Sequence, residues 1–204
     1  MKSHKSHIRC IIAVVGVLTL ASCRAKNGSE GAMPLSIGNS WTYEIDNHVP
    51  LLDSLTSDHR DTWAITSDSI ISGERWDRMQ TRGMFANRSD GVYLWLQGKR
   101  APGLFLAYPA KIGDWFRNSY GDSTVFVRDR IHVKVEAGEF SCCLYKSYQS
   151  PYVYCPGPRR IADSLFAYIY FAPGVGMVRL DRVGKNEDIE VLLSQQRLVE
   201  FIKH

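Results

Sequence analysis

The sequence predicts an all-β domain, mainly antiparallel, whose strands form a single strongly curved sheet or half-barrel. From Trp41 onward apolar and polar residues alternate with a period of two, as in half-buried strands, and few stretches keep a helical period. Turn residues interrupt these runs often enough to separate about ten short strands. At 204 residues, with 45% apolar and 23% charged side chains, the chain can bury one well-formed core. The predicted turns lie at Ser72-Gly73, Asp90-Gly91, Pro102-Gly103, Gly121-Asp122, Pro156-Gly157-Pro158 and Pro173-Gly174.

The clearest hairpin is centred on Gly138. Ile131, Val133 and Val135 alternate with polar residues, Gly138 supplies a turn, and Phe140 begins the next strand. Residues 165–171 are apolar or aromatic on both faces, so this segment is the best candidate for a central strand. The tail from 188 to 202 fits either a strand or a helix face, and we favour a strand.

Residues 1–22 have the pattern of a secretory signal. The basic residues Lys2, Lys5 and Arg9 precede an apolar run from Ile11 to Ala21. This run is about half the length of roughly 20 residues that a helix needs to cross a bilayer. We therefore expect a cleaved signal rather than a permanent transmembrane anchor.

The signal ends in Leu20-Ala21-Ser22-Cys23, which is similar to the lipobox of bacterial lipoproteins at all four positions. The resemblance implies that the Cys23 sulfur takes a diacylglyceryl group and that the signal peptidase cuts between Ser22 and Cys23. The new amine is then acylated, with chains such as palmitate. A secreted protein with a chance cysteine at this position is the alternative.

A lipidated tether over residues 23–33 precedes a single β-rich domain over residues 34–204. One acyl chain alone binds a membrane only marginally, so two or three chains make a stable anchor. The tether is small and polar, and a flexible segment of about ten residues spans roughly 17 Å. Position 24 is Arg, not the Asp that favours inner-membrane retention in enterobacterial lipoproteins. We expect a lipid-anchored protein of the outer membrane that faces the periplasm or the cell surface.

The charge of the mature chain is nearly balanced. Three of the 25 basic side chains lie in the signal, which leaves 22 basic against 21 acidic side chains and a net charge of +1. Nucleic-acid binding requires a clustered excess of Lys and Arg, so we exclude it.

Four motifs resemble a widespread group of bacterial envelope proteins and lipoproteins. Two are similar Pro-to-Trp segments at 34–41 and 109–115, where a Gly-Asx turn leads an indole into a strand; the others lie at 135–140 and 170–178. They occur in the same order as in the group, and the resemblance covers roughly residues 33–182. The resemblance implies a strongly curved antiparallel sheet related to the half-barrels of lipoprotein carriers, and it implies no activity. Similar turns explain the two Pro-to-Trp segments better than a duplicated domain does.

Three cysteines remain in the mature domain. In an oxidising compartment we expect one disulfide, between Cys155 and either Cys142 or Cys143, through a hairpin that turns near Gln149 to Pro151. Adjacent residues of a strand point to opposite faces, so only one of the two can be correctly aimed. A metal site made from these cysteines and His132 lacks the usual ligand spacings, and we predict no metal.

The sequence contains no nucleophile elbow, zincin helix, phosphate loop or dinucleotide fingerprint. His48, His59 and His132 are scattered, and we predict no catalytic residues and no cofactor. Aromatic residues cluster at 93–115 and 145–154, and these could either line a pocket or pack in the core.

These observations favour a non-enzymatic envelope lipoprotein that binds an apolar or amphiphilic ligand or docks onto an envelope protein. A hydrolase or other enzyme whose site has no recognisable motif is the alternative.

Overall fold

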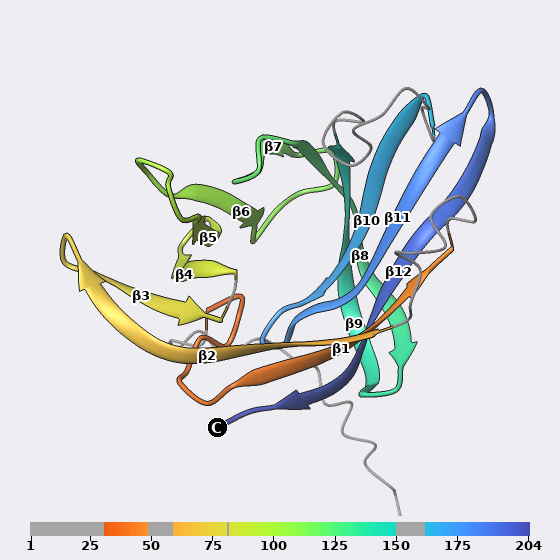
Figure 1. Cartoon of the computed structure of the whole chain (residues 1–204). Helices are drawn as coiled ribbons and strands as arrows, with labels where there is room; N and C mark the ends of the chain where they lie inside the picture. Colours follow the sequence, from red (N-terminus) through yellow and green to blue (C-terminus); the bar gives the residue numbers. More distant parts are fainter. Residues whose placement is uncertain (1–30, 49–58, 81, 150–161) are drawn as a thin grey trace, which may run out of the picture.

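The computed structural model describes residues 31–48, 59–80, 82–149 and 162–204. Within them twelve strands form one antiparallel sheet, and no α-helix occurs (Figure 1). The predicted all-β antiparallel class is confirmed, with two strands more than the approximate number expected. The strands are β1 (Ser40–Asn47), β2 (His59–Ile71), β3 (Glu74–Met79), β4 (Gly83–Arg88), β5 (Gly91–Trp95), β6 (Gly103–Ala107), β7 (Trp115–Arg117), β8 (Ser123–Val135), β9 (Gly138–Gln149), β10 (Ser164–Ala172), β11 (Gly176–Asn186) and β12 (Ile189–Ile202).

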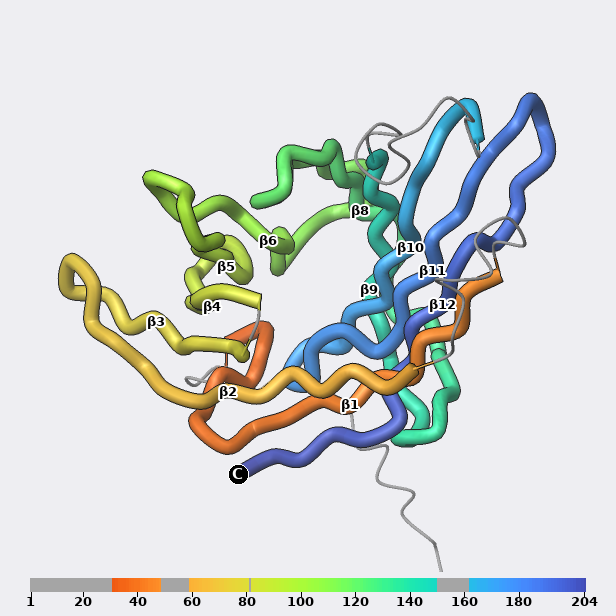
Figure 2. Tube along the Cα trace, viewed as in Figure 1, coloured from red at the N-terminus to blue at the C-terminus, as the bar shows by residue number. Residues whose placement is uncertain are grey.

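The sheet is a meander whose first and last strands pair with each other. Its order is β6-β5-β4-β3-β2-β1-β12-β11-β10-β9-β8-β7, so β6 and β7 are the two edges. The sheet bends until these edges approach each other, which makes it nearly a closed barrel (Figures 1 and 2). Bending of this kind brings strands from the two ends of the sheet into one core.

The predicted elements lie where the sequence pattern places them. Gly138, with φ +137°, turns β8 into β9 as the predicted hairpin, and Val135 pairs with Gly138. The predicted central strand is β10, which pairs with β9 on one side and β11 on the other. The C-terminal tail is a strand, because β12 pairs with both β1 and β11. The predicted turns between strands are present, except that residues 156–158 lie outside the described part.

The two Pro-to-Trp segments share a turn but have different surroundings. Gly38 and Gly113 have φ values of +94° and +92°, which favour glycine. In each turn the amide of the following Asx donates to a carbonyl three residues earlier. Trp41 is fully buried, whereas Trp115 is 74% exposed. The shared turn is therefore a local feature, and each strand's neighbours decide the burial of the indole.

The main core fills the hollow of the sheet. It joins Phe85, Leu94 and Leu106 from β4–β6 with Tyr145 and Phe171 from β9 and β10. Two aromatic side chains of this core have satisfied polar groups: the Trp41 indole donates to the Val175 carbonyl (2.6 Å), and the Tyr43 hydroxyl donates to the Met177 carbonyl (2.8 Å). The buried residues of the core lie between Met33 and Leu198, so a chain that begins at residue 24 contains all of them.

The signal at 1–22 and the tether up to residue 30 lie outside the described residues. No helix long and apolar enough to cross a membrane occurs in the part of the chain that the structure describes.

Candidate functional site

A cavity of about 870 Å³ opens beside β3, β4 and β5. Its described lining combines apolar side chains with cationic ones and contains no acidic residue. Its volume lies within the roughly 300–1,000 Å³ of ligand sites, and its lining is polar as well as apolar, with Thr66, Gln80 and Gln97 beside the cations. The apolar lining is Ile71, Met79, Met84, Trp95 and Leu96, and the cations are Arg78, Arg82 and Lys99.

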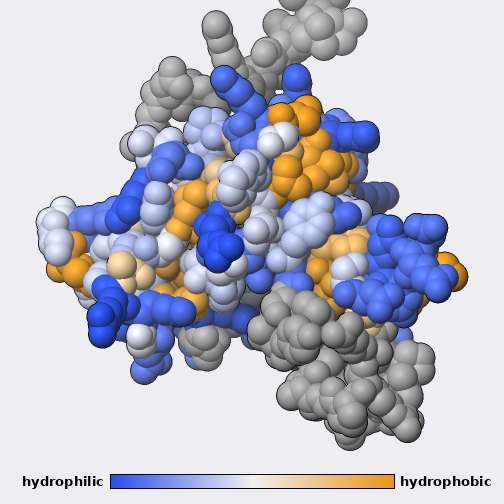
Figure 3. Space-filling view, turned by 90° about the horizontal axis from the view of Figure 1, so that it is seen from above, coloured by the Kyte–Doolittle hydropathy of each residue, from blue (hydrophilic) through white to orange (hydrophobic). Residues whose placement is uncertain are grey.

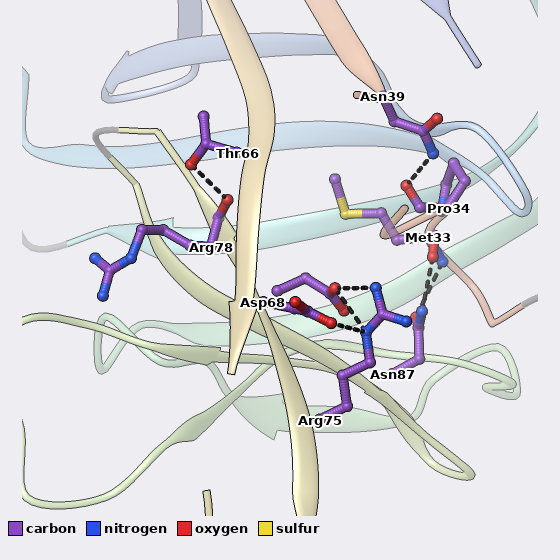
Figure 4. Close-up of polar contacts among 9 residues, drawn as sticks. Met33, Pro34, Asn39, Thr66, Asp68, Arg75, Arg78 and Asn87 are labelled. Carbon is purple, nitrogen blue, oxygen red and sulfur yellow. Dashed lines mark hydrogen bonds and ion pairs between the residues drawn. The ribbon is translucent and has the colours of Figure 1, made fainter. Parts of the chain in front are cut away.

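Glycine permits the close approach of strands at one wall of the cavity. Gly83 begins β4 with φ +124°, and a Cβ at this position would lie 2.7 Å from the Trp95 carbonyl oxygen. A larger residue would push β4 away from β5. On the opposite side of β3, the Thr66 hydroxyl of β2 donates to the Arg78 carbonyl at 3.4 Å (Figure 4). These contacts hold the cavity walls together through the backbone.

Aromatic stacking fixes the indole that lines the cavity. Trp95 packs edge-to-face on buried Trp76, with ring centroids 5.6 Å apart. Its indole N–H donates to the Lys99 carbonyl at 2.9 Å, which fastens the segment after β5 to the strand. The Arg88 guanidinium lies 5.6 Å from the Trp76 ring and 4.0 Å from the Tyr93 ring. Trp95 is therefore held in place before any ligand arrives.

The acidic residues near the cavity are each bound to another arginine. Arg75 binds both Asp68 (3.2 Å) and Asp77 (2.8 Å), as Figure 4 shows for Asp68. Glu74 receives two 2.7 Å hydrogen bonds from Arg88, and these bonds hold the pKa of Glu74 below its ordinary value.

Asp77 is more deeply placed than the other acids. Burial raises the pKa of Asp77, and the Arg75 ion pair opposes this rise.

Asp61 is bound by Arg82, whose guanidinium also lies 4.4 Å from the Trp63 ring centroid.

Arg78 and Lys99 are the cations of the cavity that no carboxylate of the described residues neutralises. Among the described residues neither forms an ion pair; the one polar side-chain contact of Arg78 is a 4.0 Å contact to the Met84 sulfur. Figure 4 shows the Arg78 guanidinium extending away from the carboxylates that Arg75 binds. The cavity therefore has a positive charge that no carboxylate in the described part of the chain balances locally.

A smaller cavity of about 180 Å³ adjoins the first and shares Leu96 and Lys99 with it. It lies where the two edges of the sheet meet: a Cβ on Gly103 of β6 would lie 2.9 Å from the Ser119 Cα in the β7–β8 turn. Asn118 orders this turn, because its side-chain oxygen accepts from the Tyr120 and Asp122 amides. Lys99 therefore lies at the junction of two cavities.

Cys142 and Cys143 point to opposite faces of β9, as predicted. Cys143 lies in the main core, whereas Cys142 packs in a second cluster with Val133 and Val178. The cross-strand neighbour of Cys142 is Ile131 in β8, and that of Cys143 is Phe171 in β10. Neither forms a disulfide with another described residue. Cys155 lies outside the described part, and its pairing stays a prediction.

The other predicted residues do not assemble into a site. His48, His59 and His132 are exposed at the end of β1, in β2 and in β8. The described residues contain no group of three His, Cys, Asp or Glu side chains placed to hold a metal ion. Ser22 and Cys23 lie outside the described part.

The aromatic clusters divide between three environments. Trp95 lines the cavity and Tyr145 is buried in the core, whereas Trp115 and Tyr148 are exposed.

Sequence reasoning missed the cavity because its cations are not adjacent in sequence. Arg78 and Lys99 are 21 positions apart, and the strands between them bring the two to one cavity. Trp95, as a member of an aromatic cluster, was the one signal that pointed there.

The fold is similar to two solved structures. One, from Bacteroides fragilis NCTC 9343, is described as an exported protein with a YmcC-like fold; it has a TM-score of 0.55 and 13% identity and covers 85% of this chain and 100% of its own. The other, from Parabacteroides distasonis ATCC 8503, is described as a lipoprotein; it has a TM-score of 0.47 and 12% identity and covers 86% and 100%. No protein-family model and no curated protein matches the chain. At this identity the likeness to the Bacteroides protein shows a shared fold.

Proposed function

We propose that this chain is a lipid-anchored protein of the cell envelope whose β-domain binds an amphiphilic molecule in the cavity beside β3, β4 and β5, without catalysing a reaction. The observation that carries the proposal is the cavity itself. Its volume of about 870 Å³ suits a molecule of lipid or drug size, and its lining combines thioether, indole and aliphatic groups with cations. Met side chains adapt to flexible apolar ligands, which suits an acyl chain.

The lipobox at Cys23 supports the placement in the envelope. A tether over residues 23–33 keeps the domain near the membrane that holds the anchor, and the structurally similar Bacteroides protein is described as exported. The outer membrane remains our expectation, because position 24 is Arg. A cavity close to a bilayer is well placed to receive molecules that leave it.

Docking onto an envelope protein is the second candidate. The observation that favours it is the edge strand β7 with the turn before it, where Trp115 of the strand is 74% exposed and Ile112 of the turn is 69% exposed. Unpaired edges and exposed apolar groups are common features of interfaces. On the face seen in Figure 3, apolar surface occurs in separate patches bordered by hydrophilic side chains. Such patches fit a small interface better than an extensive one.

The test of ligand binding is to purify the chain from residue 24 out of the periplasm of its own bacterium and analyse extracted small molecules by mass spectrometry. Met84→Trp places a larger side chain in the cavity and should abolish co-purification, whereas Met84→Leu nearly conserves volume and should retain it. Equal unfolding midpoints for the two variants would show that folding is intact. Repeated empty preparations of the wild type, or full occupancy in Met84→Trp, would contradict the proposal.

The docking candidate is tested by crosslinking in intact cells with a photoreactive residue at position 115. A photoreactive residue at position 70, which is exposed in the β2–β3 hairpin, is the control. A specific adduct from position 115 alone is the expected result if β7 is an interface. Identical patterns from both positions would remove this candidate.

A further inference from the structure

We propose that the ligand of this cavity is an anionic amphiphile, whose single carboxylate or phosphate group is bound by Arg78 and Lys99 while its chain lies along the apolar lining. The inference rests on the proposed function, because it assigns chemistry to the same cavity. Its basis is the distribution of charge around the cavity together with the placement of the apolar groups.

The charge argument begins with the acidic residues of the surrounding strands. Asp68 and Asp77 are bound by Arg75, Glu74 by Arg88, and Asp61 by Arg82. These ion pairs neutralise the four carboxylates, and none of them involves Arg78 or Lys99. Two positive charges therefore lie at a cavity whose described lining has no carboxylate.

An anionic group is the complement of this arrangement. Arg78 and Lys99 are both exposed, so solvent weakens the attraction of each for an anion, and binding of one anionic group requires both cations. A guanidinium also binds carboxylate or phosphate through two parallel hydrogen bonds, and an ammonium adds a compact charge. A neutral headgroup would leave both cations without a counter-charge.

The apolar groups explain why the anion should carry a chain. Met79 and Met84 lie at the pairing of β3 with β4, and Trp95 and Leu96 lie at the end of β5. Met84 and Trp95 offer flexible and flat apolar surface beside the cations, whereas Met79 is only 1% exposed because it packs in the main core. A free inorganic anion would leave this surface unused, whereas an acyl or alkyl chain would cover it.

The test uses the chain from residue 24 and a neutral fluorescent probe, N-phenylnaphthylamine, which reports occupation of the cavity without regard to charge. The probe is displaced with decanoate, decyl phosphate or decanol, which share one chain length and differ in their headgroup. We expect either anion to displace the probe at concentrations at least about tenfold lower than decanol does. A stronger effect of decyl phosphate would identify a phosphate headgroup, and a stronger effect of decanoate a carboxylate.

Two variants locate the anion. Arg78→Gln and Lys99→Gln should each weaken displacement by the anions about tenfold and leave displacement by decanol unchanged. Arg100→Gln is the matched control, because Arg100 is adjacent to Lys99, exposed, and absent from the described lining. The preference for anions should also decrease as NaCl concentration rises.

The outcomes separate the two proposals. If the wild type does not bind the probe, or if Met84→Trp binds it as well as the wild type does, the cavity is not the binding site and the proposed function fails. If the wild type binds the probe but decanol and the anions displace it equally, or Arg78→Gln and Lys99→Gln behave like Arg100→Gln, the binding function stands and the anionic assignment is overturned.

Discussion

Cys142 and Cys143 are adjacent in β9, yet each is buried in a different apolar cluster. Burial raises the pKa of both thiols to about 12, and the nearby Asp129 carboxylate contributes at Cys143. At pH 8 a thiol with such a pKa is ionised in only about one molecule in ten thousand, and the thiolate is the reactive form. Both residues therefore act as small apolar side chains in the folded protein.

This predicts slow alkylation of the two thiols. In the folded chain from residue 24, iodoacetamide at pH 8 should leave Cys142 and Cys143 unmodified for hours. In denaturant without reductant, the predicted disulfide to Cys155 would leave one reactive cysteine, and reductant would then raise the number to three. Intact-mass spectrometry counts the adducts at each stage. Rapid modification of the folded chain would contradict the burial, and three adducts without reductant would exclude the disulfide.

At the scale of one element, adjacent residues of β12 point to opposite faces of the sheet and therefore contribute differently to the free energy of unfolding. Leu198 is fully buried in the core, whereas Arg197 lies on the other face and binds Glu44 (3.0 Å) and Asp46 (2.6 Å) of β1. Removing a buried leucine side chain loses apolar burial and leaves a cavity, at a cost of about 2–5 kcal/mol. Side chains of the Arg197 pairs are 21–38% exposed, so solvent screens them and their contribution is about 1 kcal/mol or less.

We therefore expect Leu198→Ala to lower the free energy of unfolding by about 2–5 kcal/mol and Arg197→Ala by about 1 kcal/mol or less. Urea unfolding of the two variants and the wild type measures both. Because the two positions are adjacent, each variant is the control for the other. A larger effect at Arg197 would mean that the ion pairs, and not core packing, hold β12 against β1.

At the scale of the whole molecule, the curvature of the sheet brings its two edges together without pairing them. The Tyr145 hydroxyl of β9 donates to the Ala107 carbonyl of β6 at 2.7 Å, and Phe116 of β7 packs on the Tyr145 ring. With the close contact of Gly103 and Ser119, these interactions close the core on the side where backbone pairing is absent. Side chains, not a ladder of hydrogen bonds, complete the barrel.

The predicted membrane anchor also concerns the whole molecule. Metabolic labelling with a palmitate analogue should label the wild type, and Cys23→Ser should lose the label and leave the membrane-bound mature form undetected. Cys10→Ser is the matched control, because Cys10 lies in the signal without small residues of the lipobox type before it. Labelling that survives Cys23→Ser, or is lost in Cys10→Ser, would contradict the assignment of the lipidated residue.

Much of the fold was predictable because strand patterns are local. The β8–β9 hairpin, the central β10 and the strand at the C-terminus follow from alternation and turn glycines over a few residues. The candidate site was not predictable in this way. Arg78 and Lys99 become neighbours of one cavity only through the pairing of β3, β4 and β5, and Arg78 differs from Arg75 and Arg88 only in having no carboxylate beside it.

The sequence by itself determined the all-β class, the near-neutral charge of the mature domain and the predicted lipidation at Cys23, because each depends on composition or on residues close together in the chain. The tertiary structure decided which of two similar turns buries its tryptophan, how the sheet closes, and which cations remain without a counter-charge. Those properties depend on strand register and curvature, which bring together residues that are far apart in the sequence.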